Sequence, residues 1–398
     1  MHDPLRFHHL IPVALLALSA CGRLPLPATP ATAAATTVAT AGSPRWIVAA
    51  GPDGLSRQAL DAAGAKVIDR IPALGVVVVR GDDPALSRRL AGLPGVRWVE
   101  ADGPMQAVGG RHFRGLALLA GDDLLPRLWG METIGARRVW ATTPGDRALK
   151  VAVVDTGIDA RHADFSGRVE AGRDCINGDD DPDDDDGHGT HCAGTVAAGL
   201  GNGGVVGVAP GVTLLSVKVL DGEGGGSFVS VSAGIVDAAD RGARVISLSL
   251  SSPRTSKLLE EAVAHATAKG ALLVAASGNA GSTAPAYPAA LPQVMAVGAV
   301  RRGDMPAYFS NTGKHLSVAA PGVDILSTVP GGGWESLDGT SMACPHVAGL
   351  AALVFSRRPA WTAAQVRRRI EATAVDIGPK GFDERFGHGR IDVAEALR

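Results

Sequence analysis

The sequence predicts an α/β fold in which a doubly wound, mostly parallel sheet follows a small ferredoxin-like α+β domain. From about residue 126 onward, short apolar runs alternate with helix-like segments, and these runs are continuously apolar. Such runs are typical of parallel strands that are covered by helices on both faces. Glycine is also abundant, at 52 of 398 residues, as expected for an α/β enzyme rich in tight turns.

The larger domain is expected to span residues 126–398. Its strands are expected at Lys150–Asp155, Thr213–Leu220, Arg244–Leu250, Ala271–Ala276 and Val294–Val300. Its helices are expected to begin near His188, Val229, Lys257, Ser341 and Thr362. This alternation predicts an open sheet with helices on both sides.

The smaller domain is expected to span residues 44–107. Strand-like segments begin near Arg45, Lys66, Leu74 and Val96, and two helix-like segments separate them in the order β-α-β-β-α-β. That order indicates a ferredoxin-like fold. Residues 108–125 form a junction of mixed charge.

The N-terminus is typical of an exported protein. Residues 1–20 are interpreted as a signal peptide, because the apolar run Leu10–Ala20 is too short to span a bilayer permanently. The run ends in LSAC, which resembles a bacterial lipobox and implies attachment of a diacylglycerol to Cys21. The alternative is a plain secretory signal with Cys21 incidental. Residues 21–43 have the Ala-, Thr- and Pro-rich composition of a linker.

Charge and cysteine content exclude some functions. The net charge is −2 and the chain has no long Lys/Arg cluster, so a nucleic-acid partner is not expected. If Cys21 carries lipid, Cys175, Cys192 and Cys344 allow at most one disulfide within a monomer. A Cys192–Cys344 bridge is conceivable, but a disulfide framework does not hold this protein together.

Three motifs contain residues suited to catalysis. Asp155 ends a buried run in VVDTG, His188 lies in GHGTHCAG, and Ser341 lies in GTSMACPHVAG. A serine nucleophile needs a base, and the base needs an anion that orients it. Each motif alone has a structural explanation, such as a turn or a helix cap. His188 and His191 also have the spacing of a possible metal pair.

Together, the three motifs resemble those of the subtilisin-like serine peptidases. The order is Asp, His, Ser, with spacings of 33 and 153 residues. The resemblance covers about residues 122–398, and the preceding domain resembles the inhibitory propeptides of that family. It implies a secreted serine endopeptidase with Asp155, His188 and Ser341 as its triad. The zymogen is expected to process itself between residues 104 and 125.

The resemblance also implies partners and a location. The partners are protein or peptide substrates, the protein's own propeptide as an intramolecular inhibitor and, before processing, a membrane reached through the N-terminal lipid. The location is the cell envelope, or the medium after processing. Cys192 lies four residues after His188, where some relatives have a cysteine beneath the catalytic histidine.

The remaining site residues also follow from the resemblance. Asn279, in SGNAG, matches the asparagine that donates to the oxyanion, although a left-handed turn residue is the alternative. Substrate-binding strands are expected at Gly224, Gly225, Gly226, Ser249, Leu250, Ser251, Ala276, Ser277 and Gly278. The segments 249–252 and 275–278 contain no acidic residue, so a pocket for apolar side chains is expected.

Calcium is the expected cofactor. Seven aspartates occupy the eight positions from Asp179 to Asp186, and carboxylate oxygens at this density suit Ca²⁺. The family binds calcium in the loop before the catalytic histidine, so the expected ligands are Asp179, Asp181, Asp183 and Asp185. The alternative is a solvated acidic loop.

Two other functions remain open at this point. One is a catalytically silent binding protein with the subtilase fold. The other is a metal-dependent hydrolase that uses His188, His191 and the aspartate run. A serine-directed probe would separate the first from a peptidase, because it labels only an activated serine.

Overall fold

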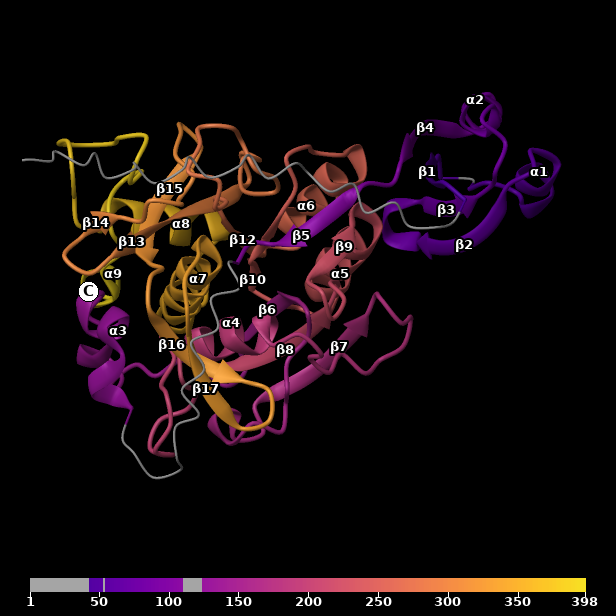
Figure 1. Ribbon diagram of the computed structural model, residues 1–398. Coiled ribbons are helices and arrows are strands. Elements are labelled where there is room, and N and C mark those ends of the chain that lie inside the picture. The colour runs from indigo at the N-terminus through magenta and orange to yellow at the C-terminus, as the bar shows by residue number, and fades with distance from the viewer. Residues whose placement is uncertain (1–42, 53, 110–123) are drawn as a thin grey trace, which may run out of the picture. The chain divides into compact units, whose positions relative to one another are not determined.

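A computed structural model describes residues 43–52, 54–109 and 124–398 (Figure 1). The predicted signal peptide, Cys21, nearly all of the linker and most of the junction lie outside the described residues. Within the described part of the chain, no helix is both long and apolar enough to cross a membrane.

A parallel sheet forms the centre of the larger region. The strand order is β14-β13-β12-β10-β6-β8-β7, with β15 beside β13, and every pair except β13–β14 is parallel. The strands are β6 (Lys150–Asp155), β7 (Val169–Asp174), β8 (Thr213–Lys218), β10 (Val245–Leu248), β12 (Leu272–Ala276), β13 (Val294–Arg301), β14 (Met305–Pro306) and β15 (Leu316–Pro321). The predicted fold class is therefore confirmed.

Helices cover both faces of this sheet. They include α4 (His188–Ala197), α5 (Phe228–Asp240), α6 (Lys257–Ala268) and α7 (Thr340–Arg357) (Figure 1). Val151 and Val153 of β6 pack in a cluster with α4 and α7, whereas Ala152 and Val154 pack in a cluster with α5 and α6. Because successive side chains point to opposite faces, both sets must be apolar, which explains the continuous apolar run.

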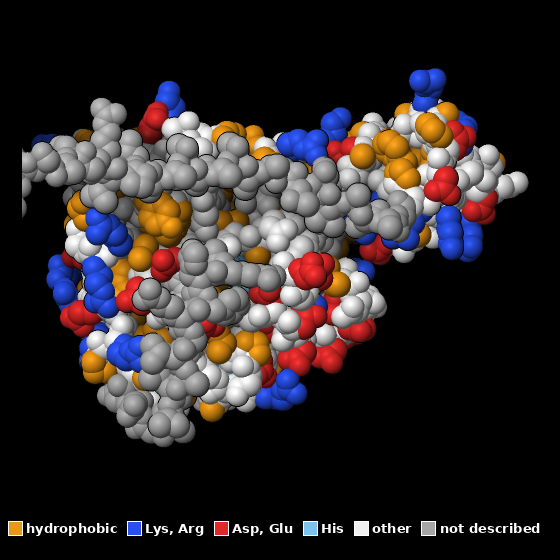
Figure 2. All heavy atoms as spheres, in the orientation of Figure 1, with side chains coloured by type: hydrophobic (Ala, Val, Ile, Leu, Met, Phe, Trp, Pro, Cys, Tyr) orange, Lys and Arg blue, Asp and Glu red, His pale blue; other side chains and the backbone are white. Residues whose placement is uncertain are grey.

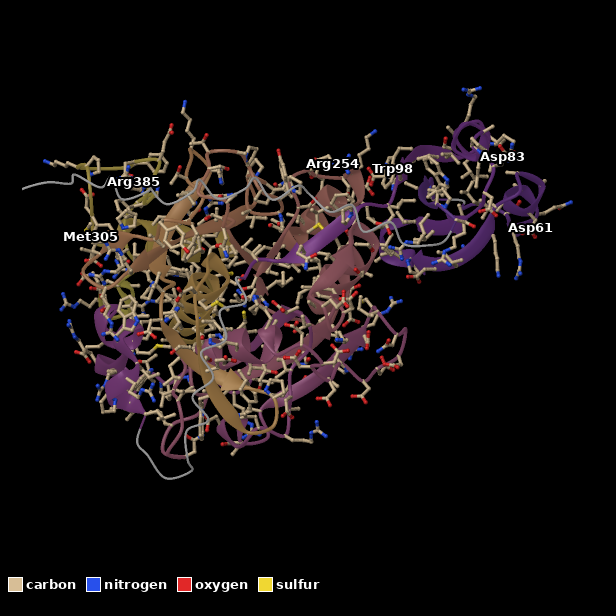
Figure 3. All side chains as sticks on the ribbon, in the orientation of Figure 1. Asp61, Asp83, Trp98, Arg254, Met305 and Arg385 are labelled. Atoms are coloured by element: carbon tan, nitrogen blue, oxygen red, sulfur yellow. The ribbon has the colours of Figure 1, made fainter. Side chains whose placement is uncertain are left out.

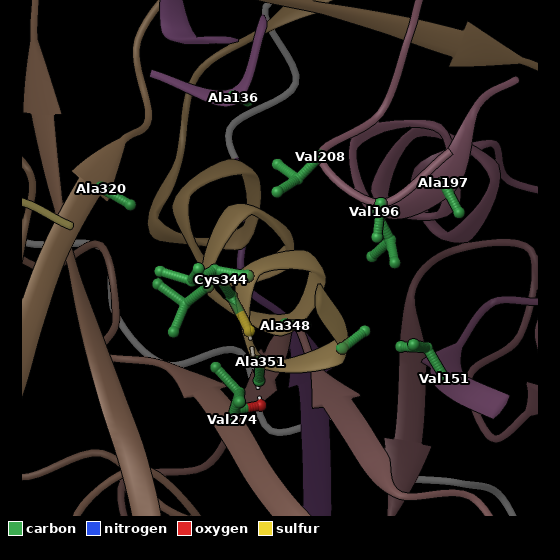
Figure 4. Close-up of a cluster of buried hydrophobic side chains, with 14 of the residues drawn as sticks. Ala136, Val151, Val196, Ala197, Val208, Val274, Ala320, Cys344, Ala348 and Ala351 are labelled. Atoms are coloured by element: carbon green, nitrogen blue, oxygen red, sulfur yellow. Dashed lines mark hydrogen bonds between the residues drawn. The ribbon is translucent and has the colours of Figure 1, made fainter. Parts of the chain in front are cut away.

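Small side chains hold α7 close to the sheet. Figure 4 shows Cys344, Ala348 and Ala351 on this helix, near Val274 of β12. The Cys344 thiol donates a hydrogen bond to the backbone oxygen of Val274 at 3.4 Å. This packing fixes the first turn of α7, which carries Ser341, against the carboxyl ends of the strands.

The smaller sheet has the predicted ferredoxin-like topology. The antiparallel strand order is β2-β3-β1-β4. Its elements are β1 (Arg45–Ala50), α1 (Arg57–Ala62), β2 (Lys66–Ile71), β3 (Val76–Arg80), α2 (Leu86–Ala91) and β4 (Val96–Ala101). Val77 and Val79 pack with α1 and α2, whereas Ile47 and Val78 join the cluster of α5 and α6. The sheet therefore also buries its second face.

One predicted strand is divided in the structure. The run Arg244–Leu250 forms β10 only to Leu248, and β11 (Leu250–Ser251) leaves the parallel sheet to pair with β5 (Pro104–Ala107). The apolar residues of both strands, Val245, Ile246, Leu248 and Leu250, are buried, so the sequence resembles one strand. The other elements are α3 (Trp129–Thr133), β9 (Gly225–Ser227), β16 (Ile325–Val329), β17 (Gly333–Leu337), α8 (Ala363–Ala372), α9 (Val393–Ala396) and short 3-10 turns at Pro72–Leu74, Leu125–Arg127, Ala136–Arg138 and Ala163–Phe165.

Candidate active site

Asp155 and His188 form a buried pair at the carboxyl end of the sheet. Asp155 is the last residue of β6, and His188 is the first residue of α4. The Nδ1 atom of His188 lies 2.7 Å from Oδ1 of Asp155. Burial of the imidazole disfavours its charged form, but the Asp155 carboxylate outweighs that effect and raises the pKa of His188 above its ordinary value. The pair therefore has the geometry of a base held by an anion.

Asp184 connects the elements that carry this pair. Its buried carboxylate accepts hydrogen bonds from the Thr156 hydroxyl at 2.8 Å and from the Thr190 hydroxyl at 2.6 Å. Thr156 follows Asp155, and Thr190 lies in the first turn of α4. Asp184 was not identified as a positioning residue from the sequence, because nothing in a run of seven aspartates distinguishes the buried one.

Ser341 contacts a backbone carbonyl of the same chain. Its Oγ donates a hydrogen bond to the Val108 carbonyl oxygen and lies 3.1 Å from the Ser249 carbonyl oxygen. The Ser249 hydroxyl in turn donates to the Ser341 carbonyl oxygen at 2.9 Å. Ser341 is fully buried in the first turn of α7. Its hydroxyl is thus directed at the peptide group that follows β5.

Asn279 is directed at the same carbonyl oxygen. Its Oδ1 accepts from the backbone N–H of Thr340 at 2.9 Å and from the Thr340 hydroxyl at 2.8 Å. These two bonds orient the amide, so that Nδ2 donates to the Val108 oxygen at 3.3 Å. A hydroxyl nucleophile and an oxyanion donor that converge on one carbonyl are what acyl transfer requires.

The segment that ends in Val108 is bound as a central strand. β5 lies between β9 and β11 in a three-stranded antiparallel sheet. The N–H of Ala107 donates to the Gly224 oxygen at 2.9 Å, and the N–H of Val108 donates to the Ser249 oxygen at 3.0 Å. The predicted residues Gly224, Gly225, Gly226, Ser249, Leu250 and Ser251 flank this strand. This is peptide binding by strand addition.

The other predicted binding residues lie at the end of β12. Ala276 is its last residue, and the Ser277 hydroxyl donates to the Asn311 carbonyl oxygen at 3.3 Å. Gly278 has a φ of 106°, and a Cβ there would lie 2.4 Å from Nδ2 of Asn311. Only glycine fits at that position. The assignment of these three residues to substrate binding stays a prediction.

Gly109 follows Val108 and lies against the His188 ring. A Cβ on Gly109 would come within 3.3 Å of His188 Nε2. Within the described part of the chain, Nε2 has no hydrogen-bond partner. The free ring nitrogen therefore lies beside the nitrogen side of the Val108–Gly109 bond, where acid–base catalysis is needed. The sequence alone did not distinguish this bond from others in 104–125.

The geometry gives no support to a metal site built on His191. Its Nε2 lies 3.0 Å from the Ile325 carbonyl oxygen and 3.1 Å from that of Glu335. Burial lowers the pKa of His191 to about 3, so the ring is a neutral packed group. Among the described residues, the one set of three side chains close enough to share an ion is Asp155, His188 and Cys192. That set includes neither His191 nor any residue of the aspartate run.

Two of the four aspartates predicted to bind calcium form ion pairs with side chains of the protein itself. Asp183 pairs with Arg161 at 2.9 Å, and Asp185 pairs with the buried Lys218. Asp179 accepts from the backbone N–H of Asp181 at 3.0 Å. Cations of the protein itself thus neutralise two of the four carboxylates. The assignment of calcium to these residues stays a prediction.

Cys175, Cys192 and Cys344 are free thiols, so the conceivable Cys192–Cys344 bridge is not formed. Burial raises the pKa of Cys175 to about 12 and that of Cys344 to about 11. Cys192 lies in α4, and its thiol donates to the Ser341 carbonyl oxygen at 3.5 Å. Cys192 and Cys344 are small packed groups in the core, and Cys175 is partly buried against it.

Comparison with known proteins agrees with this geometry. The model of the Peptidase S8 subtilase family matches residues 146–389. The chain belongs to the subtilase family. It is 43% identical over 273 residues to thermitase of Thermoactinomyces vulgaris, a match that covers 68% of this chain and 96% of thermitase. It is 42% identical over 270 residues to subtilisin Savinase of Lederbergia lenta, covering 68% of this chain and 98% of that protein.

A solved structure extends the likeness to most of this subtilase. Fervidolysin from Fervidobacterium pennivorans, a keratinolytic enzyme related to subtilisin, matches with a TM-score of 0.80 and 30% identity. The match covers 89% of this chain and 61% of fervidolysin. By homology to thermitase and the subtilisins, the subtilase is a serine endopeptidase.

Proposed function

We propose that this subtilase is an exported zymogen that cleaves its own Val108–Gly109 bond and then hydrolyses peptide bonds in other proteins. The observation that supports this most directly is the convergence of Ser341 Oγ and Asn279 Nδ2 on the Val108 carbonyl oxygen. The apolar Val108 side chain precedes the bond, in agreement with the expected preference for apolar residues. The signal-like residues 1–20 support export.

The chemistry assigns one role to each group of the triad. His188 Nε2 takes the proton of the Ser341 hydroxyl as its oxygen attacks the Val108 carbonyl carbon. Asn279 Nδ2 and the backbone N–H of Ser341 stabilise the resulting oxyanion. His188 then protonates the leaving nitrogen of Gly109. In the second half of the reaction, His188 takes a proton from a water molecule that attacks the acyl-enzyme, and it returns that proton to Ser341 as the acid product leaves. Asp155 stabilises the imidazolium and fixes its tautomer.

Contacts of the smaller domain support its role as an intramolecular inhibitor. The Glu100 carboxylate accepts from the backbone N–H groups of Lys257 and Leu258, both at 3.0 Å, at the N-terminus of α6. There it also complements the helix dipole. Trp98, labelled in Figure 3, donates from Nε1 to Glu261 at 2.9 Å, and Arg97 pairs with the same carboxylate at 2.8 Å. These contacts would hold β5 in the cleft after cleavage.

Processing at this bond would also decide where the enzyme acts. If Cys21 carries lipid, the anchor is on the N-terminal side of Val108 and the triad is on the other side. Cleavage therefore separates the anchor from the catalytic domain. After cleavage of a membrane-bound precursor, only non-covalent contacts with the anchored propeptide would hold the enzyme at the membrane. Degradation of the propeptide would then release the enzyme.

The first prediction concerns the processing bond. Purified active enzyme is expected to begin at Gly109, as measured by N-terminal sequencing and intact mass. Replacing Val108 with Asp should slow processing by about tenfold or more, because a charge would enter a site that binds an apolar side chain. Ile68→Asp, at an exposed position in the domain that precedes Val108, is the matched control. Active enzyme that begins elsewhere in residues 104–125 would contradict the assignment.

The second prediction concerns the oxyanion donor. Asn279→Ala should lower kcat by about 10²–10³-fold with little change in KM, the loss known when subtilisin loses its asparagine donor. The control is Asn202→Ala, in an exposed loop. Thermal unfolding of both variants checks the fold, because Asn279 also binds Thr340. If Asn279→Ala and Asn202→Ala lose the same kcat and the same thermal stability, Asn279 has a structural role only.

A further inference from the structure

A cavity of about 370 Å³ lies beside the bond proposed for cleavage. Its lining extends from Gln106 and Ala107, on the acyl side of the bond, to Gly109 on the leaving side, and includes His188. Its acidic lining residues are Asp184, Asp185, Asp186, Glu223, Glu335 and Asp338. Its described lining includes no lysine or arginine. Figure 2 shows further carboxylates on this face of the molecule, over β7 and β8.

These acidic side chains differ in their hydrogen-bond and ion-pair partners. Asp184 is bonded to two threonine hydroxyls, and Asp185 pairs with Lys218. Glu335 of β17 is only 7% exposed, and in the described part of the chain its Oε1 has no hydrogen-bond partner. Burial raises the pKa of this carboxyl group. A buried carboxylate oxygen without a partner is costly, so it indicates a position where a positive group from outside the described chain binds.

We propose that this cavity binds an arginine or lysine side chain of the substrate on the leaving side of the cleaved bond, with Glu335 and Asp338 as its carboxylate partners. The proposal rests on the proposed function. Asp338 lies between β17 and the first turn of α7, and one of its oxygens accepts from the backbone N–H of Asp324. Both carboxylates thus border the same cavity as Gly109, the residue after the bond.

The chain's own sequence supplies a substrate with this property. The residues after Val108 read GGRHFR, with two arginines and a histidine, and no acidic residue occurs before Asp122. A cationic side chain that enters a cavity lined with carboxylates is favoured by direct pairing and by the local field. An acidic segment would be disfavoured, because it would add like charge to the cavity. The cavity therefore selects substrates by the charge of the residues that follow the cleaved bond.

The test uses the processed enzyme and three internally quenched peptides. Each carries Met-Gln-Ala-Val before the cleaved bond and Gly-Gly followed by Arg, Gln or Glu after it. We expect kcat/KM for the Arg peptide to exceed that for the Gln peptide by about tenfold, and the Glu peptide to fall below the Gln peptide by a similar factor. The Arg advantage should shrink as salt concentration rises.

Matched variants locate the effect. Glu335→Gln and Asp338→Asn should each move the Arg-to-Gln ratio of kcat/KM toward one. Asp240→Asn should keep the ratio of the parent enzyme, because Asp240 pairs with Lys269 at 2.8 Å and is not among the cavity's lining residues. Should Glu335→Gln fail to fold, Asp338→Asn and the parent peptide series still decide the question.

The outcomes separate this inference from the proposed function. Equal kcat/KM for the three peptides would overturn the inference while leaving the peptidase intact. An equal gain from arginine at the position of Ala107 would also overturn it, because the cation would then bind on the acyl side. Failure to cleave any Val–Gly bond would reject the proposed function itself, and the inference with it.

Discussion

Replacing Ser341 with alanine is expected to lower kcat for casein by about 10⁶-fold and to leave the chain uncut between Val108 and Gly109. The Ser341 hydroxyl is the group that contacts the Val108 carbonyl, so its loss removes the atom that forms the acyl-enzyme. Gel mobility and intact mass measure processing, and a fluorophosphonate label measures the activated serine. Ser282→Ala, in a partly exposed loop, is expected to process and digest casein normally.

This result must be separated from a folding defect. The uncut Ser341→Ala chain should therefore be incubated with a trace of parent enzyme, and its thermal unfolding compared with that of the parent precursor. Cleavage in trans after Val108, with an unfolding transition like that of the parent precursor, would show that the variant is folded and lacks only the nucleophile. If the variant processes itself and digests casein as fast as the parent, Ser341 is not the nucleophile.

Much of the fold was predictable because burial on both faces leaves a clear sequence signal. β6, β8, β12 and β13 are buried at nearly every position and rich in apolar residues, since each strand contacts helices on two sides. β7 was missed because its sequence, VEAGRD, is partly exposed at the edge of the sheet and carries charged side chains. An edge strand needs only part of the apolar surface of a central strand, so its sequence resembles that of a loop.

The candidate site was predictable where its residues lie in contiguous motifs. Asp155, His188 and Ser341 each lie in a recognisable segment, and chain order related the three. Val108 could not be identified in the same way, because its role depends on the register of β5 between β9 and β11. Residue type does not encode that register within residues 104–125.

Glu335 was missed for a related reason. Nothing near it in the sequence indicates that Glu335 is buried and lines the same cavity as His188, since β17 was not predicted as a strand. The same holds for Asp184, which is one of seven aspartates in its run. Burial and unsatisfied hydrogen bonding appear only after distant segments come together, so such residues are found from the structure.

Replacing Asp155 with asparagine is expected to lower kcat by about 10⁴-fold while the chain still folds. The carboxylate lies 2.7 Å from His188 Nδ1, and its charge stabilises the imidazolium that forms as Ser341 attacks. An asparagine keeps the size of the side chain but removes that charge. Burst and steady-state kinetics with a small ester substrate measure the loss. A loss of less than about tenfold would show that Asp155 only fills space.

The pH profile of the same variant tests the electrostatic argument. In the parent enzyme the carboxylate raises the pKa of His188, and only the neutral ring accepts a proton, so kcat/KM is lost as pH falls through that raised pKa. Without the charge of Asp155, burial of the ring lowers its pKa, so the acidic limb of the profile should move to lower pH even as the plateau of kcat/KM falls.

The matched control is Asp159→Asn, at a buried carboxylate that accepts from the backbone N–H of Gly331. Asp159→Asn should leave the acidic limb of the kcat/KM profile at the pH of the parent enzyme. A limb that stays fixed in Asp155→Asn would mean that another group, and not the His188–Asp155 pair, controls proton transfer.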